Sequence, residues 1–176
     1  MSSQAYRNEK GGFPPGLRAD AARAAEDLLS RHWGGNLPVE PRWIAKVLGI
    51  EVVTTHLDEN EDGKIEKRPG QAARIYLEAS DPEVRQRFSC AHELGHFIHK
   101  LDVDFELVLH RNKASSTGEE EDEVFANAFA ASLLMPEEAV RMRVGLRMTL
   151  KQLAREFRVS REAMAHRLKS LGLEAS

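Results

Sequence analysis

The sequence lacks long apolar runs and has a single cysteine, Cys90. One cysteine excludes an intrachain disulfide, which is typical of a reducing compartment. Without a run of roughly 18 consecutive apolar residues, a membrane-spanning helix is not expected. Residues 1–15 are polar and contain no apolar signal-peptide core, so we expect a disordered leader over residues 1–16. These absences together predict a cytoplasmic protein.

Strong net charge is also absent, because the formal net charge of the 176 residues is −3. This value is too mild to indicate a bulk polyanion as the partner. The distribution is uneven, however. Residues 141–171 hold nine Lys and Arg against two Glu, a net +7, whereas residues 1–140 hold 16 basic and 25 acidic groups, a net −9. The chain therefore has an acidic body and a basic C-terminal end.

The most informative motif is His92-Glu93-Leu94-Gly95-His96, within an apolar and helix-compatible segment. Residues i and i+4 share one side of an α-helix, about 6 Å apart along its axis, so both imidazoles can reach one zinc ion. Glu93 lies about 100° further round the helix and can take a proton from water at the metal. The alternative is that both histidines are solvated helix residues.

A zinc hydrolase needs a third protein ligand and one open position. The acidic run over residues 119–123 offers several carboxylates, most of which we expect to be a solvated helix N-terminus. Glu123 differs because Asn127 follows one turn later on a helix with many apolar residues. Buried polar groups need partners. We therefore predict that Glu123 binds the metal and that Asn127 accepts a hydrogen bond from a ligand imidazole.

The pattern of apolar residues predicts an α+β fold with a small antiparallel β-sheet of about three strands packed on a helical core. The helix with the metal motif begins around Ser80-Asp81-Pro82-Glu83, with an N-cap before the proline, and ends near His99. Residues 101–114 fit no element clearly, and residues 115–118 are predicted as a loop. Other helices are predicted at Leu17–Trp33, Pro38–Leu48, Glu119–Leu134, Pro136–Val144, Leu150–Phe157 and Ser160–Leu171, and strands at Ile50–Thr55, Lys64–Lys67 and Ala73–Leu77.

The last two predicted helices form a helix-turn-helix-like element within a basic segment, residues 146–176. It follows a predicted metallopeptidase domain over residues 17–145. Ser160 is predicted to cap the second helix, and Arg161 and Arg167 are expected to point outward, where they could contact DNA or a partner protein. We favour the alternative that these helices pack against the catalytic domain or dock its substrate, because no dimerisation element is evident.

Two blocks, Phe88–His96 and Glu123–Pro136, resemble the ImmA/IrrE family of metallopeptidases. The resemblance implies a zincin-like core with a gluzincin-like site, in which His92, His96 and Glu123 bind zinc and Glu93 is the catalytic base. It also implies that Asn127 stands where thermolysin-like enzymes have a carboxylate. Family members cleave helix-turn-helix transcriptional repressors and so switch on mobile-element or DNA-damage genes. The additional C-terminal sensor-like domain of radiation-response members is expected to be absent.

The favoured hypothesis is a zinc endopeptidase whose substrate is a helix-turn-helix repressor. The alternative is a non-enzymatic DNA-binding regulator with a structural zinc, in which His99 or Cys90 closes a four-ligand site. Arg87 and Tyr76 are further candidates for binding the scissile carbonyl. Two His and one Glu also accept divalent metals other than zinc.

Overall fold

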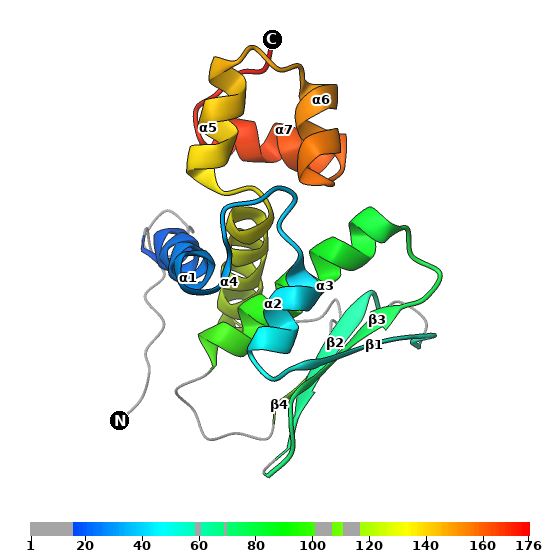
Figure 1. The fold of residues 1–176 in the computed structure, drawn as a ribbon. Helices are drawn as coiled ribbons and strands as arrows, with labels where there is room; N and C mark the ends of the chain where they lie inside the picture. The colour runs from blue at the N-terminus through cyan, green and yellow to red at the C-terminus, as the bar shows by residue number, and fades with distance from the viewer. Residues whose placement is uncertain (1–15, 59–60, 69, 101–106, 111–116) are drawn as a thin grey trace.

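The computed structural model describes residues 16–58, 61–68, 70–100, 107–110 and 117–176 (Figure 1). The predicted leader therefore lies outside the described residues, apart from Gly16. The fold is α+β, as predicted, and its elements follow one another along the chain. They are α1 (Leu17–His32), α2 (Pro41–Val47), β1 (Glu51–Thr55), β2 (Gly63–Lys67), β3 (Arg74–Glu78), α3 (Glu83–His99), β4 (Leu107–His110), α4 (Thr117–Leu134), α5 (Glu137–Gly145), α6 (Leu150–Phe157) and α7 (Arg161–Ser170).

The sheet is mixed rather than antiparallel, and in the described residues it has four strands in the order β1-β3-β2-β4. Strand β2 pairs antiparallel with both β3 and β4, whereas β1 pairs parallel with β3. The prediction of an antiparallel sheet was wrong in this one pair. Alternating side chains identify a strand but carry no information about the direction of its neighbour. Strand β4 falls in the stretch that fitted no element clearly.

One face of the sheet packs against the helices, as predicted. Ile65, Ile75 and Leu77 are fully buried on that face, opposite α3. Side chains that alternate with them lie on the other face, where the ammonium of Lys64 sits 5.1 Å from the centre of the Tyr76 ring. The sheet thus has one apolar face and one polar face, which is typical of a sheet covered on a single side.

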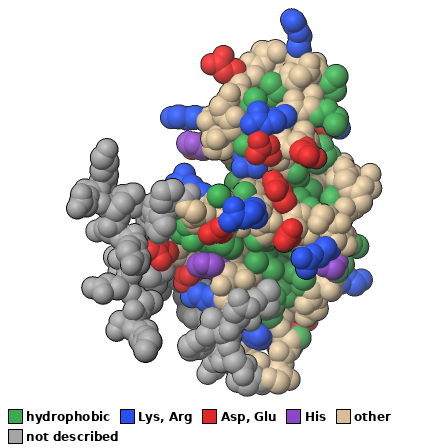
Figure 2. Space-filling model, turned by 90° about the vertical axis from the view of Figure 1, so that its left-hand side faces the viewer, with side chains coloured by type: hydrophobic (Ala, Val, Ile, Leu, Met, Phe, Trp, Pro, Cys, Tyr) green, Lys and Arg blue, Asp and Glu red, His purple; other side chains and the backbone are tan. Residues whose placement is uncertain are grey.

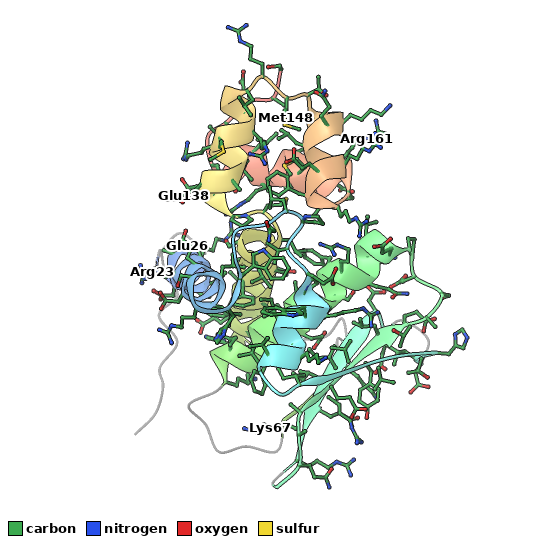
Figure 3. The ribbon with its side chains drawn as sticks, in the orientation of Figure 1. Arg23, Glu26, Lys67, Glu138, Met148 and Arg161 are labelled. Carbon is green, nitrogen blue, oxygen red and sulfur yellow. The ribbon has the colours of Figure 1, made fainter. Side chains whose placement is uncertain are left out.

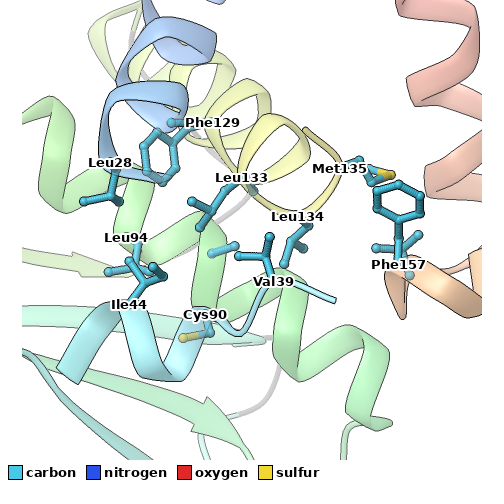
Figure 4. Close-up of a cluster of buried hydrophobic side chains, with 14 of the residues drawn as sticks. Leu28, Val39, Ile44, Cys90, Leu94, Phe129, Leu133, Leu134, Met135 and Phe157 are labelled. Atoms are coloured by element: carbon cyan, nitrogen blue, oxygen red, sulfur yellow. The ribbon is translucent and has the colours of Figure 1, made fainter. Parts of the chain in front are cut away.

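Helices α1, α3 and α4 build the core together with the inner face of the sheet (Figures 1 and 4). The core continues past the end of α4, where Met135 lies near Phe157 of α6 (Figure 4). The C-terminal helices therefore share their apolar packing with the rest of the molecule. The predicted division between residues 145 and 146 stays a prediction.

Helices α5, α6 and α7 lie together at one end of the molecule (Figure 1). Thr149 and Gln152 form a capping box at the start of α6, and Arg158 ends it in the left-handed conformation with φ of 50°. The predicted cap of α7 is confirmed, because Ser160 Oγ accepts a hydrogen bond of 3.0 Å from the Ala163 N–H. The helix-turn-helix-like arrangement predicted from the sequence is therefore present.

Several predicted element ends were wrong. Helix α3 begins at Glu83 with Pro82 in the cap position, and no side chain caps it. Ser80, one of the two residues before the proline, instead donates to the Glu78 carboxylate. Helix α4 already includes Thr117 and Gly118, which were predicted as loop. Within the described part of the chain, no helix combines the length and apolar character that crossing a membrane would need.

Candidate metal centre

The candidate site lies where α3 and α4 cross at close range. A Cβ added to Gly95 would lie 2.8 Å from Ala126 Cα and 3.2 Å from Phe129 Cβ, so only glycine permits this approach. Gly95 is inside the motif, and Ala126 is three residues after Glu123. The close crossing therefore brings the second predicted ligand block against the first.

The three predicted ligands converge at this crossing. The Nε2 atoms of His92 and His96 are 2.9 Å apart. The carboxylate of Glu123 lies 3.2 Å from Nε2 of His96 and 3.5 Å from Nε2 of His92. Both imidazoles are buried, at 0% and 4% exposure, whereas the Glu123 side chain is 35% exposed. Among the described residues, this is the one cluster of His, Cys, Asp and Glu that could hold a metal ion.

The spacing fits one small divalent cation. Zinc ligands at about 2.0–2.2 Å in a tetrahedron are about 3.3–3.6 Å from one another, which is close to the three distances observed here. Hydrogen bonds from His92 and His96, opposed by burial, hold the pKa of Glu123 well below its usual range. The acid is therefore in the ionised form that a metal requires.

Asn127 lies beside the ring of His92. Its Oδ1 atom is 3.1 Å from Nδ1 of His92, so that nitrogen can donate while Nε2 faces the other ligands. Asn127 is itself exposed, whereas its neighbours one turn away on α4 are partly buried or buried. For His96, no hydrogen-bond partner of Nδ1 is found among the described residues.

Glu93 is nearly inaccessible, with 2% of its surface exposed, and its side chain lies between α3 and β2. A Cβ added to Gly63 would lie 3.4 Å from Glu93 Oε1 and 3.4 Å from Cβ of Ser89. The carboxylate of Glu93 therefore lies close to the backbone of Gly63 in β2. The sequence did not single out Gly63, because its role depends on the packing of a strand against a helix.

The two residues that could have closed a four-ligand site point elsewhere. The Nδ1 atom of His99 is 2.9 Å from the carboxylate of Asp122, and its ring stacks on Phe125 at 4.1 Å. Burial raises the pKa of the Cys90 thiol to about 12 within the apolar core. Burial alone would also raise the pKa of Asp122, but hydrogen bonds from His99 and Lys100 outweigh it and lower that pKa.

Arg87 and Tyr76 do not face the candidate ligands. The guanidinium of Arg87 is 3% exposed and donates to the carbonyl of Val39, to the carboxylate of Glu40 at 2.8 Å and to the carbonyl of Arg158 at 3.3 Å. It is a structural brace between α3, the start of α2 and the turn before α7. Tyr76 lies on the outer face of the sheet under Lys64.

The two arginines predicted to point outward from α7 differ. Arg161 is exposed and lies on the outer side of the C-terminal helices (Figure 3). Arg167 was predicted wrongly, because its Nε donates to the Met135 carbonyl at 3.0 Å. Burial lowers the pKa of Arg167. It thus attaches α7 to the end of α4 rather than facing solvent.

A helix carrying His-Glu-x-x-His, with a glutamate from the next helix beside it and a sheet against one flank, is typical of metallopeptidases. A comparison with family models identifies one family within this class of protein. The IrrE N-terminal-like domain model (Peptidase_M78) matches residues 45–169, and the chain belongs to this family. The match includes all three candidate ligands, Glu93 and the C-terminal helices through most of α7.

A solved structure with a similar fold is a Mycobacterium tuberculosis transcriptional regulator. The two superimpose with a TM-score of 0.62 at 20% sequence identity, over 86% of this chain and 46% of the regulator. The chain thus spans just under half the length of that protein, and the likeness concerns the fold alone. A comparison with curated proteins found no match.

Proposed function

We propose that this protein is a zinc-dependent endopeptidase that hydrolyses peptide bonds in a protein substrate. The observation that carries the proposal is the convergence of His92, His96 and Glu123, with the buried carboxylate of Glu93 on the same helix. Membership of a peptidase family supports it. Three protein ligands would leave a fourth position open, as in catalytic rather than structural zinc sites.

Zinc held by these ligands would supply Lewis acidity, which polarises a carbonyl and lowers the pKa of water. Side chains of the protein would orient the ligands, compensate the charge and transfer the proton. Asn127 fixes the ring of His92 through Nδ1, and the ionised Glu123 offsets the positive charge of the metal. Glu93, kept from bulk water between α3 and β2, takes a proton from the attacking water and delivers it to the leaving amine.

We propose a helix-turn-helix transcriptional repressor as the substrate, so that cleavage acts as a stress or mobile-element switch in the cytoplasm. The support is the family, in which the substrate is expected to be a protein. The substrate proposal is separate from the proposal of the reaction, and each has its own test.

A DNA-binding regulator is the second candidate, supported by α6 and α7 and by the name of the structurally similar M. tuberculosis regulator. Two observations count against it. Arg167 is engaged with the Met135 carbonyl. On the side of the molecule shown in Figure 2, which is the left-hand side of Figure 1 and faces away from α6, Lys and Arg are interspersed with Asp and Glu, so no basic surface extends there. A structural zinc would also require a fourth ligand, and neither His99 nor Cys90 faces the other three.

The reaction is tested by mixing the wild type and the Glu93→Gln variant with zinc and an unfolded model protein, and the substrate by repeating the assay with helix-turn-helix repressors from the same organism. We expect cleavage to slow on the order of 10²–10⁴-fold, the usual contribution of a general base, with zinc content unchanged. Glu138→Gln, at an exposed position of α5, is the matched control and should cleave like the wild type. Undiminished cleavage by Glu93→Gln would refute the mechanism. Loss of gel-shift binding to DNA in Arg161→Gln would favour the regulator.

A further inference from the structure

A compact polar contact joins the end of α3 to the beginning of α4. Asp122 is bound through both carboxylate oxygens. His99 Nδ1 lies 2.9 Å from Oδ1, and Lys100 Nζ lies 2.5 Å from Oδ2. His99 is the last residue of α3 and Lys100 is its C-cap. The Asp122 side chain is only 17% exposed, so these contacts are partly shielded from water and are stronger than surface ion pairs.

Residues that precede and follow Glu123 in α4 contact the end of α3. Consecutive helix residues diverge by about 100°, so Asp122 points to the end of α3 while Glu123 points to the imidazoles. Two residues further on, the ring of Phe125 stacks on His99 with planes 13° apart, and it also stacks on Phe129 at 6.3 Å. The first turns of α4 are thereby held at positions 122 and 125.

Glu123 depends on such support because its side chain is less enclosed than the two imidazoles that it meets. Its side chain is 35% exposed. The tight contact between the two helices at Gly95 and Ala126 comes almost one turn later. A metal ligand must keep its position to within about 0.5 Å to bind well. The residues that fix α4 beside Glu123 therefore decide how well the carboxylate meets the two imidazoles.

We propose that His99, Lys100 and Asp122 form a positioning clamp that sets Glu123 for metal binding. This inference rests on the proposed metal site. None of the three residues touches the metal position itself. Removing one of them should weaken metal binding while the three ligands remain present, since residues that orient ligands typically contribute 10–100-fold to metal affinity.

The experiment measures zinc affinity of the full chain by competition with a chromophoric chelator, so the readout does not depend on peptidase activity. In Asp122→Asn the dissociation constant should rise about 10–100-fold. The matched control is Glu156→Gln, which removes a similarly exposed ion pair with Arg143 at 2.7 Å, between α5 and α6. Its zinc affinity should equal that of the wild type. Melting temperatures of the metal-free proteins report the general loss of stability in each.

Lys100→Met serves as a second variant if Asp122→Asn does not fold, because it removes the contact to one oxygen only. It should also weaken zinc binding. Zinc affinity in Asp122→Asn or Lys100→Met equal to that of Glu156→Gln would overturn the clamp and leave the proposed function intact. A wild-type chain that binds no zinc would overturn both, so the two failures are distinguishable.

Discussion

The helix pairs α3–α4 and α6–α7 differ in the kind of side chain that they bury. The buried surface of α3 includes five polar or charged side chains. They are Arg87, Ser89, His92, Glu93 and His96. The buried residues of α6 and α7 are all apolar, and they are Leu153, Ala154, Phe157, Met164 and Leu168. Charged side chains of α6 and α7 lie mainly outside this core.

This difference distinguishes α3–α4, which forms the candidate metal site, from α6–α7, which does not. Burying a titratable group costs free energy unless a partner compensates for it. The α6–α7 pair carries little of this cost, because Arg167, which turns inward from α7, donates to the Met135 carbonyl. The α3–α4 pair carries two buried imidazoles and the half-buried carboxylate of Glu123 close together. A bound cation is the simplest compensation, so the pair departs from ordinary packing where function requires it.

Two helical glycines give the largest test of this comparison. In Gly95→Ala the added methyl group meets Ala126 Cα at 2.8 Å, so the metal-bearing helices must separate. We expect a loss of about 1–3 kcal/mol of unfolding free energy, the usual cost of overpacking, together with weaker zinc binding. Urea unfolding and chelator competition measure the two effects.

Gly145→Ala is the control for that prediction. A Cβ at Gly145, the last residue of α5, has nothing within 4 Å. Alanine is the better helix former, so this variant should be neutral or more stable by up to about 1 kcal/mol. Equal destabilisation by both substitutions would mean that the α3–α4 crossing is no more constrained than the exposed end of α5.

The candidate ligands could be predicted from the sequence because their relation is local or repeats a known pattern. His92, Glu93 and His96 lie within about one helical turn, where geometry follows from spacing alone. Glu123 required a second pattern, with Asn127 one turn later. The caps at Thr149 and Ser160 are also local, since a cap contacts residues two or three positions away.

What the sequence did not predict depends on contacts between distant segments. The inward turn of Arg167 requires the Met135 carbonyl, which lies 32 residues earlier. The brace at Arg87 joins residues 47 and 71 positions away. Two further features also depend on contacts between distant segments. They are the parallel pairing of β1 with β3 and the approach of Gly63 to Glu93. No periodicity in the chain encodes which surface an element meets.

Arg167 and Arg161 give the second test, because one attaches α7 to the body and the other does not. Replacing Arg167 with Gln removes the hydrogen bond from its Nε to the Met135 carbonyl, which leaves a largely buried acceptor. We expect a loss of about 1–3 kcal/mol, the cost of an unsatisfied buried group. Arg161→Gln, at an exposed position, should stay within about 0.5 kcal/mol of the wild type. Thermal or urea unfolding distinguishes them, and equal losses would contradict the inward position of Arg167.

The smallest expected effect concerns Glu78, a carboxylate whose partners are hydrogen-bond donors of the chain rather than a metal. It accepts from the N–H groups of Leu57 at 2.7 Å and Ser80 at 2.8 Å, and these bonds lower its pKa from 4.5 to about 2. A lowered pKa in the folded state means that this carboxylate stabilises the protein above pH 4.5. The contribution is lost as the pH falls towards 2.

Glu78→Gln should therefore be less stable than the wild type at neutral pH, and the difference should shrink between pH 4.5 and 2. Urea unfolding across this range measures it, and the comparison at neutral pH, where the metal ligands are deprotonated, is repeated with and without a chelator. Because the Glu78 partners belong to the chain, the difference at neutral pH should be the same whether or not metal is present. A difference that changes on chelation would mean that Glu78 is coupled to the metal centre. The distinction between carboxylates satisfied by the fold and carboxylates that require a ligand would then fail.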